Sequence, residues 1–379
     1  MEIERFLRPE LVEGRPRWAS TDSARVWRDV LQRRLAAQRL TGDGLPHAAD
    51  VARLLACVQS QEYAHALWSL GMRTRGLGAA AAQAEFDRGD ILRTHILRPT
   101  WHFVAAEDIR WILEVTSSRV QKVNQTIYRR EGLDRATLER GVALIVEELE
   151  GGRFRTRSEL GRALAARGLV SERLRLAYVV MNAELEGVIC SGPLRGAQQT
   201  YALLDERAPQ PATGGGDVAE LARRFFLGHG PASIQDLARW SSLTIGQCRD
   251  AVAVVKEHLD CITVEGVELW FDPDAPEPRP SSGALLLPLY DEVTLSYPVL
   301  NFPSAYGHPH QPSEDLFVGC IIIAETNVGL WRRSVKGRKM IMEITLAPGV
   351  MPDSRPLVEA AAVDLASFTG KELELTISS

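Results

Sequence analysis

The chain has 379 residues, of which 45% are hydrophobic and 25% charged, and its formal net charge is −5 at pH 7. These values are typical of a soluble globular protein with about two to four domains or subdomains, each able to bury a core. They exclude a protein coated in positive charge but allow a local basic groove, and no stretch approaches the roughly 18 consecutive apolar residues of a membrane span.

The N-terminus and the cysteines indicate where in the cell the protein is expected and which stabilising sites it lacks. Residues Met1 to Arg5 lack the basic-then-apolar layout of a signal peptide, so we expect a cytoplasmic protein. The cysteines include no Cys-x-x-Cys pair, and an odd, scattered set argues against a disulfide framework or a structural zinc site. We expect them to be buried small hydrophobic side chains; they are Cys57, Cys190, Cys248, Cys261 and Cys320.

The first elements are helical. Residues 20–40 carry an apolar stripe at helical spacing and predict one helix. Apolar residues recur at the same spacing up to Val58, but positions 61, 62 and 65 on the continuing face are polar. This phase slip predicts two helices joined by a break at 59–62.

Two glutamines lie in that break. On an unbroken helix Gln59 and Gln61 would point roughly 200° apart, whereas across a break their carboxamides can converge on one site. The alternative is that both glutamines cap the helix ends or are solvated.

A hairpin follows the second helix. Large apolar and β-branched residues from Ile91 to Leu97, the turn Arg98-Pro99-Thr100 and an extended stretch from Trp101 to Val104 predict it. A helix over about 106–130 comes next. Helix, break, helix, hairpin and helix is the order of a winged-helix unit, with Arg98 expected at the tip of the wing.

The same order of predicted helices and a hairpin then occurs twice more. Three helices and a hairpin are predicted over 132–208, where Ser158 is the expected cap of the middle helix, and again over 217–272 after a linker rich in glycine and proline. The pattern therefore predicts three tandem winged helices.

Strand patterns dominate the C-terminal part. The predicted fold is accordingly α+β, and the predicted domains are residues 1–131, 132–208, 217–272 and 283–379. A long loop at 297–313 contains His308-Pro309-His310, which lacks a nearby third ligand, so we expect no metal site.

A basic run near the C-terminus is interpreted either as a solvated hairpin or as a nucleic-acid contact. It comprises Arg332, Arg333, Lys336, Arg338 and Lys339.

Taken together, four stretches resemble the winged-helix DNA-binding domain family, which includes the bacterial AlkZ/YcaQ-type DNA glycosylases. They are Gln59-Ser60-Gln61, Arg98-Pro99-Thr100-Trp101-His102, Cys190-Ser191-Gly192-Pro193 and Leu287-Pro288-Leu289-Tyr290-Asp291. The resemblance covers roughly residues 20–345.

The resemblance implies a function as well as a fold. It implies three tandem winged helices and a C-terminal β-rich domain around a basic channel for duplex DNA, and removal of alkylated purines or unhooking of interstrand crosslinks. The family's catalytic Gln-x-Gln motif maps onto Gln59 and Gln61. Further DNA contacts are expected from two regions: Arg98, Thr100 and His102 near the first wing, and Arg332, Arg333, Lys336 and Arg338 in the basic run.

Two carboxamides suffice chemically for one class of substrate. Hydrolysis of an N-glycosidic bond passes through an oxocarbenium-like transition state. An N3- or N7-alkylated purine already carries positive charge and leaves without a general acid, so the protein needs only to place a water and to face a dipole towards the sugar. We therefore hypothesise a glycosylase for cationic lesions that is poor on normal bases.

The competing interpretation is a non-enzymatic DNA-binding protein or transcriptional regulator built from the same modules. The third helices of the second and third predicted units carry few basic side chains that could read base edges. The chain has no coiled-coil heptads, which would have indicated a dimer. We therefore expect a monomer that binds double-stranded DNA near the nucleoid without a cofactor. The chain shows no Gly-x-Gly-x-x-Gly, Walker, Gly-x-Ser-x-Gly or His-Glu-x-x-His motif.

Overall fold

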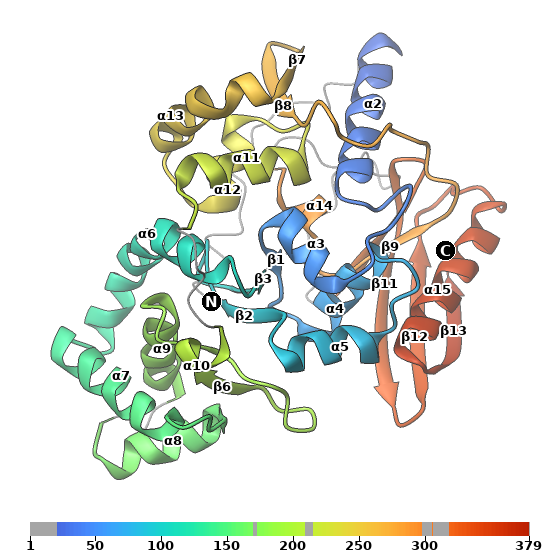
Figure 1. Ribbon diagram of the computed structural model, residues 1–379. Coiled ribbons are helices and arrows are strands. Elements are labelled where there is room, and N and C mark those ends of the chain that lie inside the picture. Colours follow the sequence, from blue (N-terminus) through green and yellow to red (C-terminus); the bar gives the residue numbers. More distant parts are fainter. Residues whose placement is uncertain (1–20, 170–172, 209–214, 298–304, 306–317, 379) are drawn as a thin grey trace.

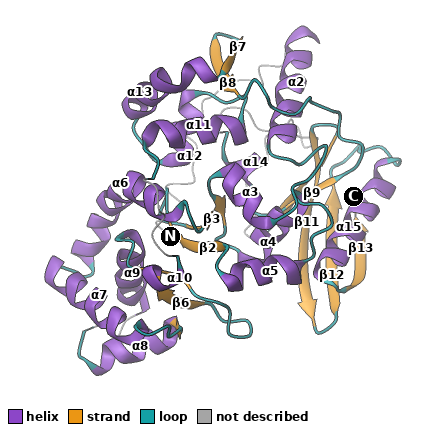
Figure 2. Cartoon of the chain, viewed as in Figure 1, coloured by secondary structure: helices purple, strands orange, loops and turns teal. Residues whose placement is uncertain are grey.

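A computed structural model describes residues 21–169, 173–208, 215–297, 305 and 318–378 (Figure 1). It is a mixed α+β structure, in which helices outnumber strands except near the C-terminus (Figure 2). Among the described residues, no helix combines the length and apolar character needed to cross a membrane. The predicted loop at 297–313, with His308 and His310, lies almost entirely outside the described residues.

The centre of the molecule is built from the segment that contains the two glutamines. Its elements are α3 (Ala48–Leu55), β1 (Val58–Gln59), α4 (Tyr63–Met72), α5 (Ala79–Arg88), β2 (Ile91–His95) and β3 (Trp101–Ala105). The three strands form an antiparallel sheet in the order β1-β3-β2. In Figure 1 this segment lies between the other groups of helices and strands.

The break between α3 and α4 is confirmed, and it contains a strand. After Ala56, which adopts a positive φ of 59°, the chain runs extended through β1 and pairs with β3. This pairing places Gln59 opposite His102. The hairpin of β2 and β3 is also confirmed, with Ile91 opposite Ala105 and His95 opposite Trp101.

Helix α5 is an element that the sequence pattern did not reveal. An alanine run begins it, and alanine has the highest helix propensity. Gly89 ends it in the left-handed conformation, and its N–H donates to the carbonyls of Glu85 and Phe86. The helix was missed because its apolar face is mostly alanine, which gives a weak periodic signal.

Helix α6 (Ile109–Arg130) leads from the centre to a second group of helices and strands. That group consists of α7 (Arg135–Leu149), β4 (Arg155–Thr156), α8 (Arg157–Ala166), α9 (Arg173–Leu185), β5 (Ile189–Ser191), β6 (Thr200–Leu203) and α10 (Leu204–Arg207). The expected cap at Ser158 was wrong. Thr156 caps α8 instead, in a capping box with Glu159.

A third group packs above the centre in Figure 1. It contains α11 (Val218–His229), α12 (Ile234–Ser241), α13 (Ile245–Val255), a short 3-10 turn η1 (Lys256–His258), β7 (Asp260–Val264) and β8 (Val267–Phe271). The predicted hairpin is present and turns at Glu265 and Gly266, both of which have positive φ. Helix α2 (Thr21–Ala37) packs beside this group, since Trp27 and Val30 share a small core with Val264 and Leu269.

The C-terminal part is a five-stranded sheet in the order β13-β12-β11-β10-β9. Its elements are β9 (Leu285–Leu287), α14 (Glu292–Leu295), β10 (Gly319–Ile323), β11 (Thr326–Lys336), β12 (Lys339–Leu346), α15 (Ser354–Thr369) and β13 (Glu372–Ser378). Helix α15 joins this sheet to the centre, because Phe368 packs against Trp68 of α4 at 5.2 Å between ring centroids. Trp68 Nε1 also donates to the carbonyl of Leu286 at 2.8 Å.

A buried ion pair connects the same two parts of the molecule. The guanidinium of Arg73, just after α4, donates to both carboxylate oxygens of Asp291 at 2.7 and 2.9 Å, and neither side chain is exposed. Asp291 also accepts from Ser69 Oγ and from the N–H of Val293. Asp291 therefore stabilises the start of α14 and its connection to α4.

We predict that Asp291→Ala lowers the free energy of unfolding by about 3–5 kcal/mol, because it leaves the buried charge of Arg73 uncompensated. Urea denaturation of the full chain measures this change. Asp364→Ala, which alters an exposed carboxylate on α15, is the matched control and should change stability by less than about 0.5 kcal/mol. A loss below about 1 kcal/mol in Asp291→Ala would contradict the assignment.

Candidate functional site

Gln59 lies where three parts of the chain meet. It ends β1, it is only 4% exposed, and it faces α14 on one side and the hairpin turn on the other. Its backbone N–H donates to Glu292 Oε1 at 2.7 Å, and its side-chain Oε1 accepts from Arg98 Nη2 at 2.9 Å. Both the main chain and the carboxamide of Gln59 are therefore held by charged groups.

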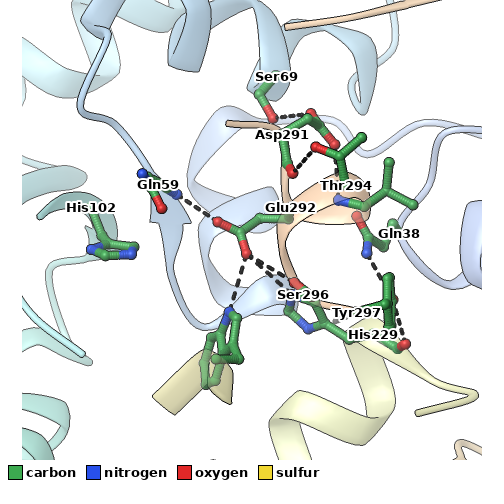
Figure 3. Close-up of polar contacts among 12 residues, drawn as sticks. Gln38, Gln59, Ser69, His102, His229, Asp291, Glu292, Thr294, Ser296 and Tyr297 are labelled. Carbon is green, nitrogen blue, oxygen red and sulfur yellow. Dashed lines mark hydrogen bonds and ion pairs between the residues drawn. The ribbon is translucent and has the colours of Figure 1, made fainter. Parts of the chain in front are cut away.

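Glu292 is the anionic side of this site. Its fully buried carboxylate accepts from the N–H of Gln59, from Trp240 Nε1 at 3.1 Å and from Ser296 Oγ at 3.3 Å. Figure 3 shows it between Gln59 and His229, whose Nε2 lies 3.6 Å from Glu292 Oε2. Burial alone would raise the pKa of the Glu292 carboxyl, but interactions with His229, Arg98 and His102 lower this pKa to about 2, so Glu292 is an anion at neutral pH.

Arg98 is the cationic side. It lies in the hairpin turn between β2 and β3, where it was expected, and its guanidinium turns inward. It donates to Gln59 Oε1, to the carbonyl of Trp240 at 3.0 Å and to His102 Nε2 at 3.1 Å. Trp240 of α12 thus contacts Glu292 through its indole and Arg98 through its carbonyl.

His102 is a neutral acceptor in this arrangement. Burial and the charge of Arg98 lower the pKa of His102 to about 3. Its Nδ1 lies 3.0 Å from the carbonyl of Thr100, which can only accept, so Nδ1 carries the proton and Nε2 accepts from Arg98. The side chain is fully buried, and the residue is paired with Gln59 in the sheet.

Gln61 lies at the end of the same sheet and is half-buried. Its Oε1 accepts from the backbone N–H of Trp101 at 3.4 Å, next to the pairing of Gln59 with His102. Arg93 holds the intervening backbone, since its Nη2 donates to the carbonyl of Ser60 at 2.8 Å and to that of Gln61 at 3.4 Å. The carboxamide of Gln61 therefore contacts Trp101 of β3, whereas the carboxamide of Gln59 contacts Arg98 in the hairpin turn.

Thr100 completes the group expected near the first wing. It is 7% exposed, and its hydroxyl has no hydrogen-bond partner among the described residues. A buried, unpaired hydroxyl beside the glutamines is the kind of group that water or a ligand satisfies.

The basic run lies on the hairpin of β11 and β12, which turns at Gly337 between Lys336 and Lys339. Arg338 is 91% exposed and lies 3.6 Å from Glu372, while Arg332 is exposed and paired with Glu343. Arg333 differs, because it is half-buried and donates to the carbonyl of Ala64 on α4 at 3.1 Å. This hairpin is thereby joined to the segment that carries Gln61.

Sequence reasoning missed Glu292 and Trp240 as parts of the site. Glu292 lies just after the motif that ends at Asp291, and Trp240 lies in the third predicted unit. No local signal could reveal a contact with Gln59 across 233 positions of the chain.

The expectation that all five cysteines are buried was wrong for Cys261, which is exposed on β7. Among the described residues, no group of three or more His, Cys, Asp or Glu side chains is arranged to hold a metal ion.

The comparisons with known proteins now identify the family. The model of the AlkZ-like DNA glycosylases matches residues 51–368 of the chain. The chain belongs to the AlkZ-like DNA glycosylase family. The matched region contains Gln59, Gln61, Arg98 and Glu292, and so includes the whole site described above.

Two relatives of this AlkZ-like chain come from Streptomyces sahachiroi. One, an interstrand DNA cross-link repair glycosylase, is 28% identical over 233 residues, which cover 57% of this chain and 61% of the relative. The alignment thus spans less than two thirds of that relative. The other is the solved structure of DNA glycosylase AlkZ, with a TM-score of 0.73 and 20% identity, covering 93% of this chain and 99% of that chain. This likeness establishes the shared fold.

We predict that His102 remains neutral from pH 8 down to about pH 5, because its pKa is lowered to about 3. NMR of the protein with labelled histidine measures this titration. An unfolded histidine has a pKa of about 6.5, so below that pH the unfolded state binds more protons and His102 makes folding less stable as the pH falls. Arg98→Met should raise the pKa of His102, since it removes the nearby positive charge. A wild-type midpoint above pH 5 would contradict the assignment.

Proposed function

We propose that this chain is a monofunctional DNA glycosylase that removes cationic alkylated purines from duplex DNA. The observation that carries the proposal is Gln59 itself, whose carboxamide is held by Arg98 and whose backbone is held by Glu292, within the region that matches the AlkZ-like family. A carboxamide oxygen has two lone pairs. One accepts from Arg98, and the second remains to accept from an attacking water.

The proposed chemistry needs no general acid. An N3- or N7-alkylated purine leaves as a neutral base when the bond to C1′ breaks, so the protein has only to orient the water and to accommodate positive charge on the sugar. Gln59 and Gln61 supply two fixed dipoles for this purpose. The negative charge of Glu292, next to the backbone of Gln59, adds a favourable field for an oxocarbenium-like transition state.

Interstrand crosslinks are a second proposed substrate. The name of one relative refers to interstrand cross-link repair. A crosslink that joins two purines through alkylated ring nitrogens presents the same cationic leaving group, so the chemistry proposed for a simple lesion also releases one arm of such a crosslink.

We further propose how the chain holds DNA. In this proposal residues 1–131, 132–208 and 217–272 are three winged helices, residues 283–379 are a C-terminal β-rich domain, and the protein acts on the nucleoid as a monomer. Arg98, Thr100 and His102 shape the lesion site, while Arg332, Arg333, Lys336 and Arg338 place the hairpin of β11 and β12 against phosphate.

A non-enzymatic DNA-binding role is the second candidate. It is favoured by the burial of Gln59, which is 4% exposed and already bonded through its side-chain oxygen. In that case Gln59 would serve only to join β1 to the hairpin turn, and the wild-type protein would bind duplex DNA without releasing any base.

We predict that Gln59→Ala and Gln61→Ala each slow the release of 7-methylguanine about 10²–10³-fold, the usual loss for one preorganised polar group. Single-turnover assays on duplex DNA measure the rate, and binding of the same duplex should stay within about threefold of wild type. Gln125→Ala on the exposed face of α6 is the matched control. Uracil, a neutral leaving base, should not be released. If the wild-type protein releases no 7-methylguanine, the glycosylase function is excluded and the non-enzymatic DNA-binding role is the remaining candidate.

We predict that Arg338→Ala reduces the slope of log Kobs against log salt by about 0.9, which is the contribution of one phosphate contact to duplex. Arg135→Ala is the control, because Arg135 on α7 is equally exposed at 92% and is also paired with a glutamate. Fluorescence anisotropy between about 50 and 200 mM salt measures both slopes. Equal slopes in wild type and Arg338→Ala would place the hairpin away from DNA.

A further inference from the structure

A second polar cluster lies at the same end of the central sheet as Gln61. His95 is the last residue of β2, Trp101 is the first residue of β3, and the two are paired in the sheet. The N–H of Trp101 donates to Gln61 Oε1. Since neighbouring strands lie about 4.8 Å apart, Gln61, Trp101 and His95 form a row along one edge of the sheet.

A buried carboxylate from another part of the chain orients this histidine. Glu184 of α9 is 1% exposed, and its Oε2 lies 2.5 Å from His95 Nδ1. Its other oxygen accepts from Trp101 Nε1 at 3.3 Å. Because Glu184 is the acceptor, Nδ1 of His95 carries the proton, and the lone pair of the neutral ring is on Nε2. Among the described residues, no hydrogen bond occupies that nitrogen.

Arg93 joins the cluster to the glutamine motif. Its guanidinium carbon lies 4.4 Å from the centroid of the Trp101 ring, and its nitrogens donate to the carbonyls of Ser60 and Gln61. The centroid of the His95 ring lies 4.4 Å from the centroid of the same Trp101 ring. The histidine, the indole and the motif are therefore in one continuous set of contacts.

A carboxylate that fixes one nitrogen of an imidazole and leaves the other as a base is the arrangement that activates nucleophiles in many hydrolases. The two carboxamides of the motif can orient a water, but neither can take its proton at neutral pH. The mechanism proposed above lacks a proton acceptor. The pair of His95 and Glu184 lies beside the motif and offers such an acceptor, which is Nε2 of His95.

We propose that His95, oriented by Glu184, accepts the proton of the attacking water, an inference that rests on the proposed glycosylase function. In this step the water oxygen forms a bond to C1′ while the bond from C1′ to the purine nitrogen breaks. The bonding electron pair leaves with the purine and neutralises its positive charge. One water proton moves to Nε2 of His95, and the carboxylate of Glu184 stabilises the resulting imidazolium.

The test compares His95→Ala, His95→Gln and Glu184→Gln with wild type on duplex DNA containing 7-methylguanine, with added imidazole as the probe. Loss of a general base costs about 10²–10⁴-fold in rate, so we expect single-turnover release to fall at least 10²-fold in both His95 variants while the affinity for DNA is retained. Imidazole should restore part of the rate in His95→Ala, where it can occupy the vacated space. His47→Ala, which removes an exposed histidine 3.5 Å from Glu85, is the matched control and should behave as wild type.

Two outcomes would overturn the inference. One is release by His95→Gln within about threefold of wild type. The other is a slow His95→Ala that remains folded by circular dichroism but gains nothing from imidazole, which would make His95 only a link between α9 and the hairpin. Absence of release by wild type is a different result, because it rejects the proposed function itself.

Discussion

The site depends on one physical constraint, which is the burial of an anion and a cation on opposite sides of a single glutamine. Glu292 holds the backbone of Gln59 and Arg98 holds its side chain. Taking such charges out of water costs several kcal/mol for each ion unless hydrogen bonds replace the lost hydration. Gln59 and Trp240 supply those bonds to both ions, so the position of the glutamine follows from the need to satisfy them.

This constraint requires three distant segments to fold together. Gln59 comes from the break after α3, Glu292 from the start of α14, and Trp240 from α12. The buried pair of Arg73 and Asp291 holds the first two segments in register immediately beside the site. A conformation in which one segment moves away leaves at least one ion with fewer hydrogen-bond partners. The carboxamide of Gln59 is therefore preorganised, as electrostatic stabilisation of a transition state requires.

Local patterns in the sequence predicted much of the fold and part of the site. The phase slip at residues 59–62 located the break, and the turn Arg98-Pro99-Thr100 located the hairpin, because both signals depend only on neighbours in the chain. The direction of the Arg98 side chain could not be predicted, because it depends on the carbonyl of Trp240 and the oxygen of Gln59, which are distant in the sequence. The role of Glu292 depends on a contact across 233 positions, which no local pattern encodes.

In the proposed mechanism Gln59 and Arg98 act as one catalytic unit, with the guanidinium fixing the carboxamide. A double-mutant cycle on single-turnover release of 7-methylguanine tests it most directly, using Gln59→Ala, Arg98→Met and the combination. Residues that act together are strongly non-additive, so we predict that the double variant is no slower than Gln59→Ala by more than about threefold. Losses that simply multiply would contradict the account, because they would mean that Arg98 contributes independently of the glutamine it holds.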